Sequence, residues 1–180
     1  MRNGSRLFAA CFVAAGLAGH AHATVFYARD EALRLAFPDA ERTEARDFFL
    51  TAAQRTEIEQ RARAPLESDL LTVYVGYRNG AAAGYAIFDT HVVRTFPETF
   101  LVVLTPEGVV SATYVLAFYE PLEYLPAERW LRQFDGKRAS DDLRIGPGIA
   151  GITGSTLTSH AVAGGIRRAL AIYAVLLGDR

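Results

Sequence analysis

The 180-residue sequence contains a single cysteine, Cys11, and its basic residues do not outnumber its acidic ones. One cysteine cannot form a disulfide within the chain, attach a haem through Cys-x-x-Cys-His or ligate an iron–sulfur cluster. With 19 basic and 20 acidic residues, the formal net charge is −1. The chain therefore lacks the excess of basic residues that favours nucleic-acid binding, and we expect no nucleic-acid partner.

The first 23 residues have the three-part pattern of an export signal. Two arginines precede an apolar run over residues 7–19, and alanines occupy positions −3 and −1 of a cleavage site after Ala23. The run is shorter than the ~20 residues that a membrane-spanning helix needs. We therefore expect cleavage of this signal peptide and a periplasmic protein, with an uncleaved membrane anchor as the alternative. Cleavage would remove Cys11, so electron transfer by residues 24–180 would require an organic cofactor.

Residues 24–180 are expected to form one globular domain, since 51% of the chain is hydrophobic and 22% is charged. Asn79-Gly80 between two apolar stretches predicts a tight hairpin, and Thr51 with Gln54 matches a helix capping box. Short connections between strands favour antiparallel pairing. We predict strands over 45–50, 70–78, 82–90, 100–104 and 109–118, and helices over 29–37, 52–63, 127–134 and 158–177. The expected fold is α+β, with an antiparallel-rich sheet of two hairpins and packed helices.

Several common enzyme motifs are absent or lack their context. Residues 146–151 fit the pattern G-x-G-x-x-G, but only 29 residues follow, too few for the rest of a dinucleotide-binding unit. No Gly-Lys-Ser/Thr completes a phosphate-binding loop, and no Gly-x-Ser-x-Gly marks a hydrolase nucleophile. Beyond residue 23 the only histidines are His91 and His160, which without cysteine do not indicate a zinc site. We therefore predict no metal site and no catalytic residue of these classes.

A hydroxyl-rich segment precedes the last predicted helix, where residues 153–159 read Thr-Gly-Ser-Thr-Leu-Thr-Ser. One hydroxyl is enough to cap a helix, and Thr158 or Ser159 can accept from the free N–H groups of the first turn. The segment has five hydroxyls, however, and Gly154 lets its backbone bend toward a ligand. Free N–H groups at a helix N-terminus also stabilise a phosphate. The residues alone support capping and anion binding equally.

Residues 150–158, Ala-Gly-Ile-Thr-Gly-Ser-Thr-Leu-Thr, resemble the signature Asp-x-x-Ser/Thr-Gly-Ala-Thr-x-Ser/Thr of the FMN-binding domain family. This family includes the RnfG and NqrC subunits of bacterial redox complexes and stand-alone exported flavoproteins. Segments 76–86, 105–110 and 130–137 are similar to further family segments in the same order. The resemblance implies that Thr156 carries FMN through a phosphoester bond, made from FAD by a separate flavin transferase. It also implies that further residues line the cofactor site: Thr153, Gly154, Ser155, Leu157, Thr158, Glu120 and Lys137.

The sequence departs from the signature at Ala150, where the family usually has Asp, and at Ser155, where it usually has Ala. The resemblance implies a periplasmic electron-transfer flavoprotein whose partners are membrane or periplasmic redox proteins. One alternative is a reductase that delivers electrons directly to a small acceptor. The other, which the missing carboxylate at Ala150 keeps open, is a module with non-covalent FMN or no flavin that acts as a structural subunit of a membrane redox complex.

Two further sets of side chains are candidates for contact with a flavin ring. Three aromatic residues can stack on the ring or belong to the ordinary core: Phe118, Tyr119 and Phe134. Three polar residues can contact it from the sheet or form a solvated strand end: His91, Arg94 and Thr95.

Overall fold

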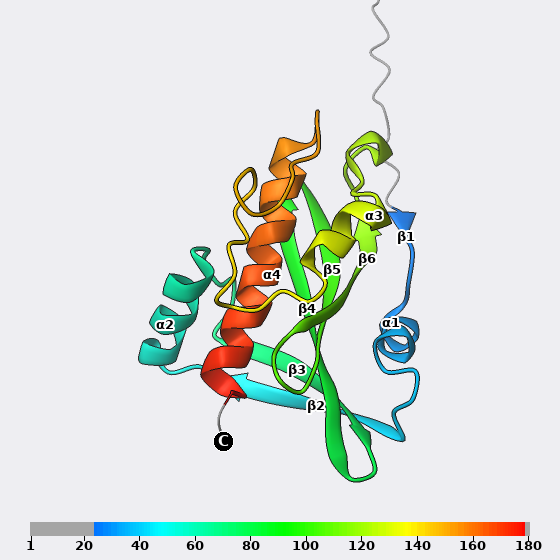
Figure 1. The fold of residues 1–180 in the computed structure, drawn as a ribbon, viewed down its shortest axis with the longest axis vertical. Helices are drawn as coiled ribbons and strands as arrows, with labels where there is room; N and C mark the ends of the chain where they lie inside the picture. The colour runs from blue at the N-terminus through cyan, green and yellow to red at the C-terminus, as the bar shows by residue number, and fades with distance from the viewer. Residues whose placement is uncertain (1–23, 179–180) are drawn as a thin grey trace, which may run out of the picture.

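The structure is a computed structural model that describes residues 24–178 (Figure 1). The predicted signal peptide, residues 1–23, lies outside the described residues. None of the helices among residues 24–178 is long and apolar enough to cross a membrane.

A six-stranded antiparallel sheet forms the centre of the fold, with strand order β1-β6-β5-β4-β3-β2. Its strands are β1 (Thr24–Val25), β2 (Arg42–Phe49), β3 (Leu70–Arg78), β4 (Ala81–Val93), β5 (Phe96–Leu104) and β6 (Val110–Phe118). The predicted turn at Asn79-Gly80 joins β3 to β4, and both residues have the positive φ, 51° and 76°, that a tight hairpin turn requires. The strands from β3 to β6 pair with their neighbours in the sequence, so their order follows from local connections.

The two predicted hairpins are joined by a third that the sequence did not indicate. Strands β4 and β5 extend beyond the predicted limits and pair as far as Val93 and Phe96, leaving Arg94-Thr95 as the turn. Arg94 adopts a left-handed φ of 55° without being glycine. Pro97 lies inside β5, opposite Val92, at a position where proline ordinarily argues against a strand. Strands β3 to β6 therefore form a continuous meander rather than two separate hairpins, and β2 and β1 lie at the two edges of the sheet.

The helices are α1 (Arg29–Ala36), α2 (Ala52–Ala62), α3 (Glu128–Leu131) and α4 (Thr156–Leu176), with the short 3₁₀ helices η1 (Leu122–Tyr124) and η2 (Arg132–Phe134). The predicted capping box at the start of α2 is confirmed, since the Thr51 hydroxyl accepts from the Gln54 backbone N–H and the Gln54 side chain accepts from the Thr51 backbone N–H. Helix α4 begins two residues before its predicted start, so it includes Thr156 as its first residue.

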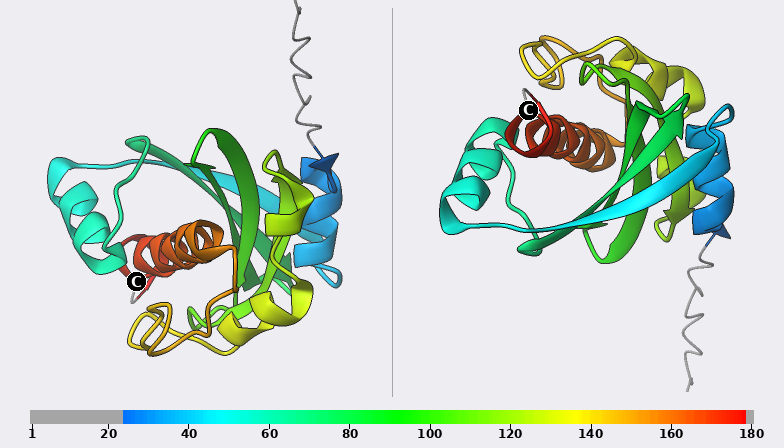
Figure 2. Two further views of the ribbon diagram at one scale, coloured as in Figure 1. Left: turned by 90° about the horizontal axis from the view of Figure 1, so that it is seen from above. Right: turned by 90° about the horizontal axis from the view of Figure 1, so that it is seen from below.

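Helices cover the two faces of the sheet unequally (Figures 1 and 2). Alternate residues of β5 point to opposite faces, and both sets are buried. The larger core lies under α4 and contains Phe100, Val102 and Ile166, with α2 alongside α4. A smaller core lies under α1 and contains Leu101 and Val103. The α+β class with an antiparallel sheet and packed helices is therefore confirmed.

Candidate functional site

The end of the molecule where α4 begins, called here the Thr156 end, brings together three segments that are distant in the sequence. Figure 1 shows β4 and β6 running toward this end and α4 running away from it. The Ser155 hydroxyl donates to the Tyr124 carbonyl at 2.8 Å, and the Arg94 guanidinium lies 5.0 Å from the centre of the Tyr124 ring. The start of α4, the β4–β5 turn and η1 therefore share one surface.

None of the five hydroxyls of residues 153–159 caps α4. The Ser155 hydroxyl bonds the Tyr124 carbonyl, and Ser159 accepts from the Ile152 N–H at 3.2 Å and donates to the Ser155 carbonyl at 2.9 Å. The alternative in which Thr158 or Ser159 caps the helix is therefore wrong. The N–H groups of the first turn keep no intrahelical partner, so the positive end of a 21-residue helix is uncapped.

Accessibility separates the hydroxyls of the signature into two sets. Thr153 and Thr156 are exposed, as is Gly154, whose φ of 83° turns the chain into the helix. Thr158 retains only 3% of its surface and Ser159 none. An enzyme that modifies a threonine here can reach Thr156 or Thr153 but not Thr158. The side chain of Leu157, 51% exposed, lies on the open surface beside Thr156.

The loop before α4 is held by fixed hydrogen bonds. The Trp130 indole N–H donates to the Ala150 carbonyl at 2.6 Å, and the Gln133 side chain accepts from the Ala150 N–H at 2.9 Å. Ala150 is itself exposed, so its side chain points to a position that a carboxylate could occupy without burial. The loop before α4 is thus anchored at Ala150 by α3 and η2 and at Ser155 by η1.

The structure brings Glu120 to the Thr156 end but not Lys137. The Glu120 carboxylate is buried and accepts from the Phe96 N–H at 3.4 Å, at the start of β5. The Lys137 carbonyl accepts from the Val110 N–H at 2.9 Å, at the start of β6, whereas the Thr156 end lies at the other end of that strand. A nine-residue strand spans roughly 30 Å, so Lys137 does not share a site with Thr156.

The aromatic and polar candidates outside the signature are also separated by the fold. Phe118 and Phe134 are fully buried, while Tyr119 is half-buried. Arg94 and Thr95 are exposed in the β4–β5 turn, as expected of a solvated strand end. His91 is not part of such an end, because it is buried beneath α4; for this residue the alternative of a solvated position is wrong.

His91 belongs to a buried ionic network that the sequence did not reveal. Its Nδ1 lies 2.6 Å from a carboxylate oxygen of Asp89, and its Nε2 lies 2.8 Å from Oε1 of Glu98. From α4, the Arg168 guanidinium donates to both Asp89 oxygens at 2.6 and 2.7 Å. We call these four residues, Asp89, His91, Glu98 and Arg168, the buried ionic network.

The close approach of α4 to β4 depends on a glycine at position 165. A Cβ at this position would lie only 2.7 Å from Oδ1 of Asp89. Glycine here lets the Asp89 carboxylate fit against the helix backbone, where Arg168, one turn further along, can bond it. The network therefore fixes the position of α4 on the sheet.

The charged groups of the network shift one another's pKa values. Burial opposes ionisation of Asp89, but hydrogen bonds from His91 and Arg168 outweigh it and lower the pKa of this carboxyl. Burial also opposes the charge on His91, but its bonds to Asp89 and Glu98 raise its pKa from 6.5 to about 9. Burial raises the pKa of Glu98, and the neighbouring charge of Glu120 adds to this rise. The network thus holds His91 as a cation and makes Glu98 the carboxyl that most readily takes a proton.

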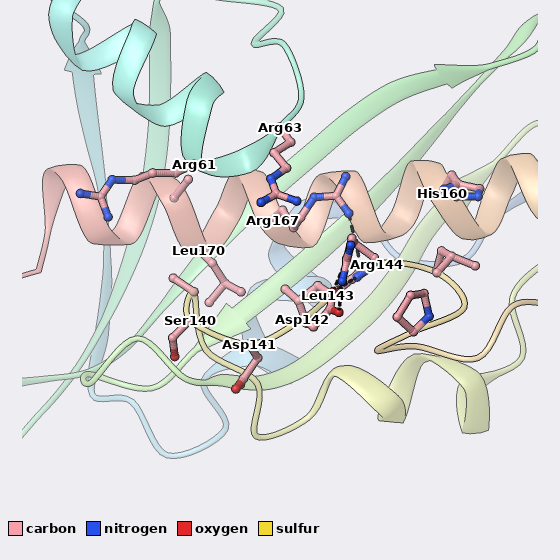
Figure 3. Close-up of a pocket in the computed structure, with 14 residues that line it drawn as sticks. Arg61, Arg63, Ser140, Asp141, Asp142, Leu143, Arg144, His160, Arg167 and Leu170 are labelled. Atoms are coloured by element: carbon pink, nitrogen blue, oxygen red, sulfur yellow. Dashed lines mark hydrogen bonds and ion pairs between the residues drawn. The ribbon is translucent and has the colours of Figure 1, made fainter.

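Two cavities lie along α4 beyond the Thr156 end. One, of about 760 Å³, lies between α4, the end of α2 and the loop of residues 139–147 (Figure 3). The other, of about 790 Å³, is lined by His91 on β4 and by residues of α4. Arg63, His160 and Arg167 border both cavities, so the two are adjacent. His160 lies one helical turn beyond Thr156, which places this groove next to the hydroxyl-rich segment.

No family model matches this chain. It is 30% identical over 122 residues to the RnfG-type component of the Na(+)-translocating ferredoxin:NAD(+) oxidoreductase complex of Acetobacterium woodii, an alignment that covers 58% of this chain and 56% of the relative. The chain therefore spans little more than half the length of this curated relative. Among solved structures, the crystal structure of Shewanella oneidensis NqrC has a TM-score of 0.51 and 12% identity, with 76% of this chain and 81% of that one covered.

Fold and site together define a class of α+β domain, with a meander sheet and a long final helix that starts at a hydroxyl-rich, uncapped loop. The comparisons confirm the more specific resemblance, because the RnfG-type protein is similar in sequence and NqrC shares the fold. The chain is thus similar to the RnfG and NqrC subunits that carry the FMN-binding domain.

Proposed function

We propose that this chain is a periplasmic redox subunit that carries FMN linked by a phosphoester bond to Thr156 and exchanges electrons with membrane or periplasmic redox proteins. The observation that carries the proposal is the exposed Thr156 hydroxyl at the uncapped N-terminus of α4, next to four other hydroxyls that do not cap the helix. The sequence relative supports the redox role, since it is a subunit of a ferredoxin:NAD(+) oxidoreductase complex.

The residues present fit a phosphate at this position. The free N–H groups of the first turn and the helix dipole stabilise negative charge, and the exposed Thr156 hydroxyl supplies the oxygen for the ester. In the transfer reaction, Thr156 Oγ would form the bond to the FMN phosphorus, AMP of the FAD donor would leave, and the hydroxyl proton would be released. Ser155 keeps the loop in place through its bond to the Tyr124 carbonyl.

A bound FMN accepts one or two electrons and would allow the subunit to connect two-electron donors with one-electron carriers. The chain's own residues would orient it. Large apolar side chains are exposed on the segments that meet at the Thr156 end, namely Phe96, Leu122 and Leu157, where they can exclude water from one side of an apolar ring. The covalent bond would keep the cofactor attached outside the cytoplasm, where a lost flavin is not readily replaced.

Coexpression of the full chain with a flavin transferase tests the attachment residue. We expect the wild type to keep its flavin fluorescence on a denaturing gel and Thr156→Ala to lose it completely. Thr153→Ala is the matched control, because Thr153 is also exposed in the same loop, and it should remain labelled. Thr158→Ala should remain labelled as well, because the Thr158 side chain is buried. Label retained by Thr156→Ala would show that the attachment residue is a different one.

The alternative of a module without covalent flavin is favoured by Ala150, which replaces the usual acidic residue of the signature. Because Ala150 is exposed and its backbone is fixed by Trp130 and Gln133, Ala150→Asp would restore a carboxylate without altering the loop. The intact mass of protein from its native host distinguishes the two functions. A mass equal to residues 24–180 plus FMN less one water, the loss that goes with the phosphoester bond, supports the proposal and the export signal together, whereas the bare polypeptide mass supports the structural module.

A further inference from the structure

The two hydrogen bonds of His91 require one proton more than a neutral imidazole and two ionised carboxylates would carry. A neutral imidazole has one N–H, yet both ring nitrogens of His91 lie within 2.8 Å of a carboxylate oxygen. His91 is therefore an imidazolium that donates to both carboxylates, and transfer of one proton to Glu98 would leave His91 neutral and accepting from Glu98. With Arg168 and Asp89 both charged, the network has a net charge of zero in either arrangement.

Glu98 has room for one further proton. It is fully buried, and its second oxygen, Oε2, has no hydrogen-bond partner among the described residues. A proton bound at Oε2 while His91 stays an imidazolium would change the charge of the network from zero to +1. Burial without a partner makes the ionised form of this oxygen costly, so the site is suited to accept a proton when a negative charge appears nearby.

The network lies close to the Thr156 end. His91 lines the same cavity as His160, which is one turn of α4 from Thr156. On the other side, the Glu120 carboxylate raises the pKa of Glu98 and accepts from the Phe96 N–H at the Thr156 end. The charged groups that act on Glu98 are His91 and Asp89 of β4 and Glu120 after β6, and Arg168 of α4 is linked to them through its bonds to Asp89.

We propose that Glu98, hydrogen-bonded to His91, is a proton acceptor that takes up one proton from solvent when a flavin held at Thr156 gains one electron. The inference rests on the proposed function. One electron from a reductant adds one negative charge to the flavin, and one proton bound at Glu98 Oε2 adds one positive charge to the network, so the total charge is unchanged. His91 acts as a positioning residue that holds Glu98 in place and keeps its other oxygen bonded.

The experiment uses the flavin-loaded full chain, titrated with dithionite in the presence of redox mediators. We expect the potential for the first electron to depend more steeply on pH in the wild type than in Glu98→Gln. One additional proton per electron changes the equilibrium tenfold for each pH unit, which is about 59 mV for a one-electron couple. Glu123→Gln is the matched control, since Glu123 is an exposed carboxylate of η1 near the same end, and its slope should equal that of the wild type.

A second measurement, infrared difference spectroscopy, observes the carboxyl directly. The difference spectrum between reduced and oxidised wild type should show a new protonated carboxyl band, and this band should be absent from Glu98→Gln and reduced in His91→Gln. Equal slopes in wild type and Glu98→Gln, or no carboxyl band in flavin-loaded wild type, would overturn the proton site while leaving the flavin attachment intact. A wild type that takes up no flavin refutes the proposed function, and the redox-linked proton uptake with it.

Discussion

The charge on His91 makes the stability of this protein depend on pH in a range where few other side chains titrate. His91 is buried, and its bonds to Asp89 and Glu98 raise its pKa from 6.5 to about 9 in the folded state. In the unfolded chain the imidazole returns to its ordinary pKa. Because the folded state binds the proton more tightly, His91 stabilises it below the unfolded pKa, and this contribution is lost as the pH rises through about 9.

The size of the effect follows from the shift. A difference of about 2.5 pKa units corresponds to about 3 kcal/mol. Roughly all of it is present at about pH 6, about 2 kcal/mol remains at about pH 7.5, and almost none remains at about pH 9.5. The raised pKa of Glu98 has the same sign: its contribution is present below the ordinary pKa of a glutamate and is lost as the pH rises through the raised value. The free energy of unfolding should therefore fall as the solution becomes alkaline.

Urea denaturation of the wild type and of His91→Gln at a series of pH values measures this contribution. The amide of glutamine can still bond one carboxylate but does not titrate, so His91→Gln should be less stable than the wild type near about pH 6 and should lose less stability above it, by about 2–3 kcal/mol. Identical pH dependence in the two proteins would refute the assignment of a charged, buried His91. His160→Gln, at an exposed histidine of α4, is the control and should follow the wild type.

Two further predictions concern local packing. In urea denaturation, Gly165→Ala should destabilise the fold by about 1–3 kcal/mol, because its Cβ would lie 2.7 Å from Asp89 Oδ1. Gly164→Ala is the control. Its Cβ would meet nothing closer than 3.7 Å, so this substitution should be neutral or stabilising. Thr51→Ala should cost about 1 kcal/mol by removing the capping box of α2, and Thr56→Ala on the same helix should change the unfolding midpoint little; equal losses would contradict the role of the cap.

Local signals predicted the elements that local interactions stabilise. Asn79-Gly80 indicated the β3–β4 turn because both residues accept positive φ at low cost, and Thr51 with Gln54 indicated the start of α2 because the capping bonds lie within one turn. The β4–β5 turn was missed because no local signal in the sequence marks it. Arg94 has no intrinsic preference for a left-handed φ, so the long pairing of the two strands must impose it.

The sequence located the hydroxyl-rich segment of residues 153–159, but it did not show which of its hydroxyls are engaged in hydrogen bonds and which are exposed. Five hydroxyls supported capping and phosphate binding equally, and only the folded chain shows that Ser155 and Ser159 are engaged with other backbone groups. Lys137 lies near the signature in the sequence yet at the other end of the sheet in space, because β6 separates Val110 from the Thr156 end.

The sequence by itself determined the α+β class, the β3–β4 hairpin, the long final helix and the hydroxyl-rich segment at its start, since each depends on hydrophobic periodicity, turn residues or a contiguous motif. The tertiary structure decided which hydroxyls remain exposed and which charges meet. Asp89 and Arg168 are 79 residues apart, and no local pattern links them. Their ion pair exists because α4, with a glycine at position 165, packs closely enough on the sheet to bring the two side chains into a buried space where unpaired charges would be costly.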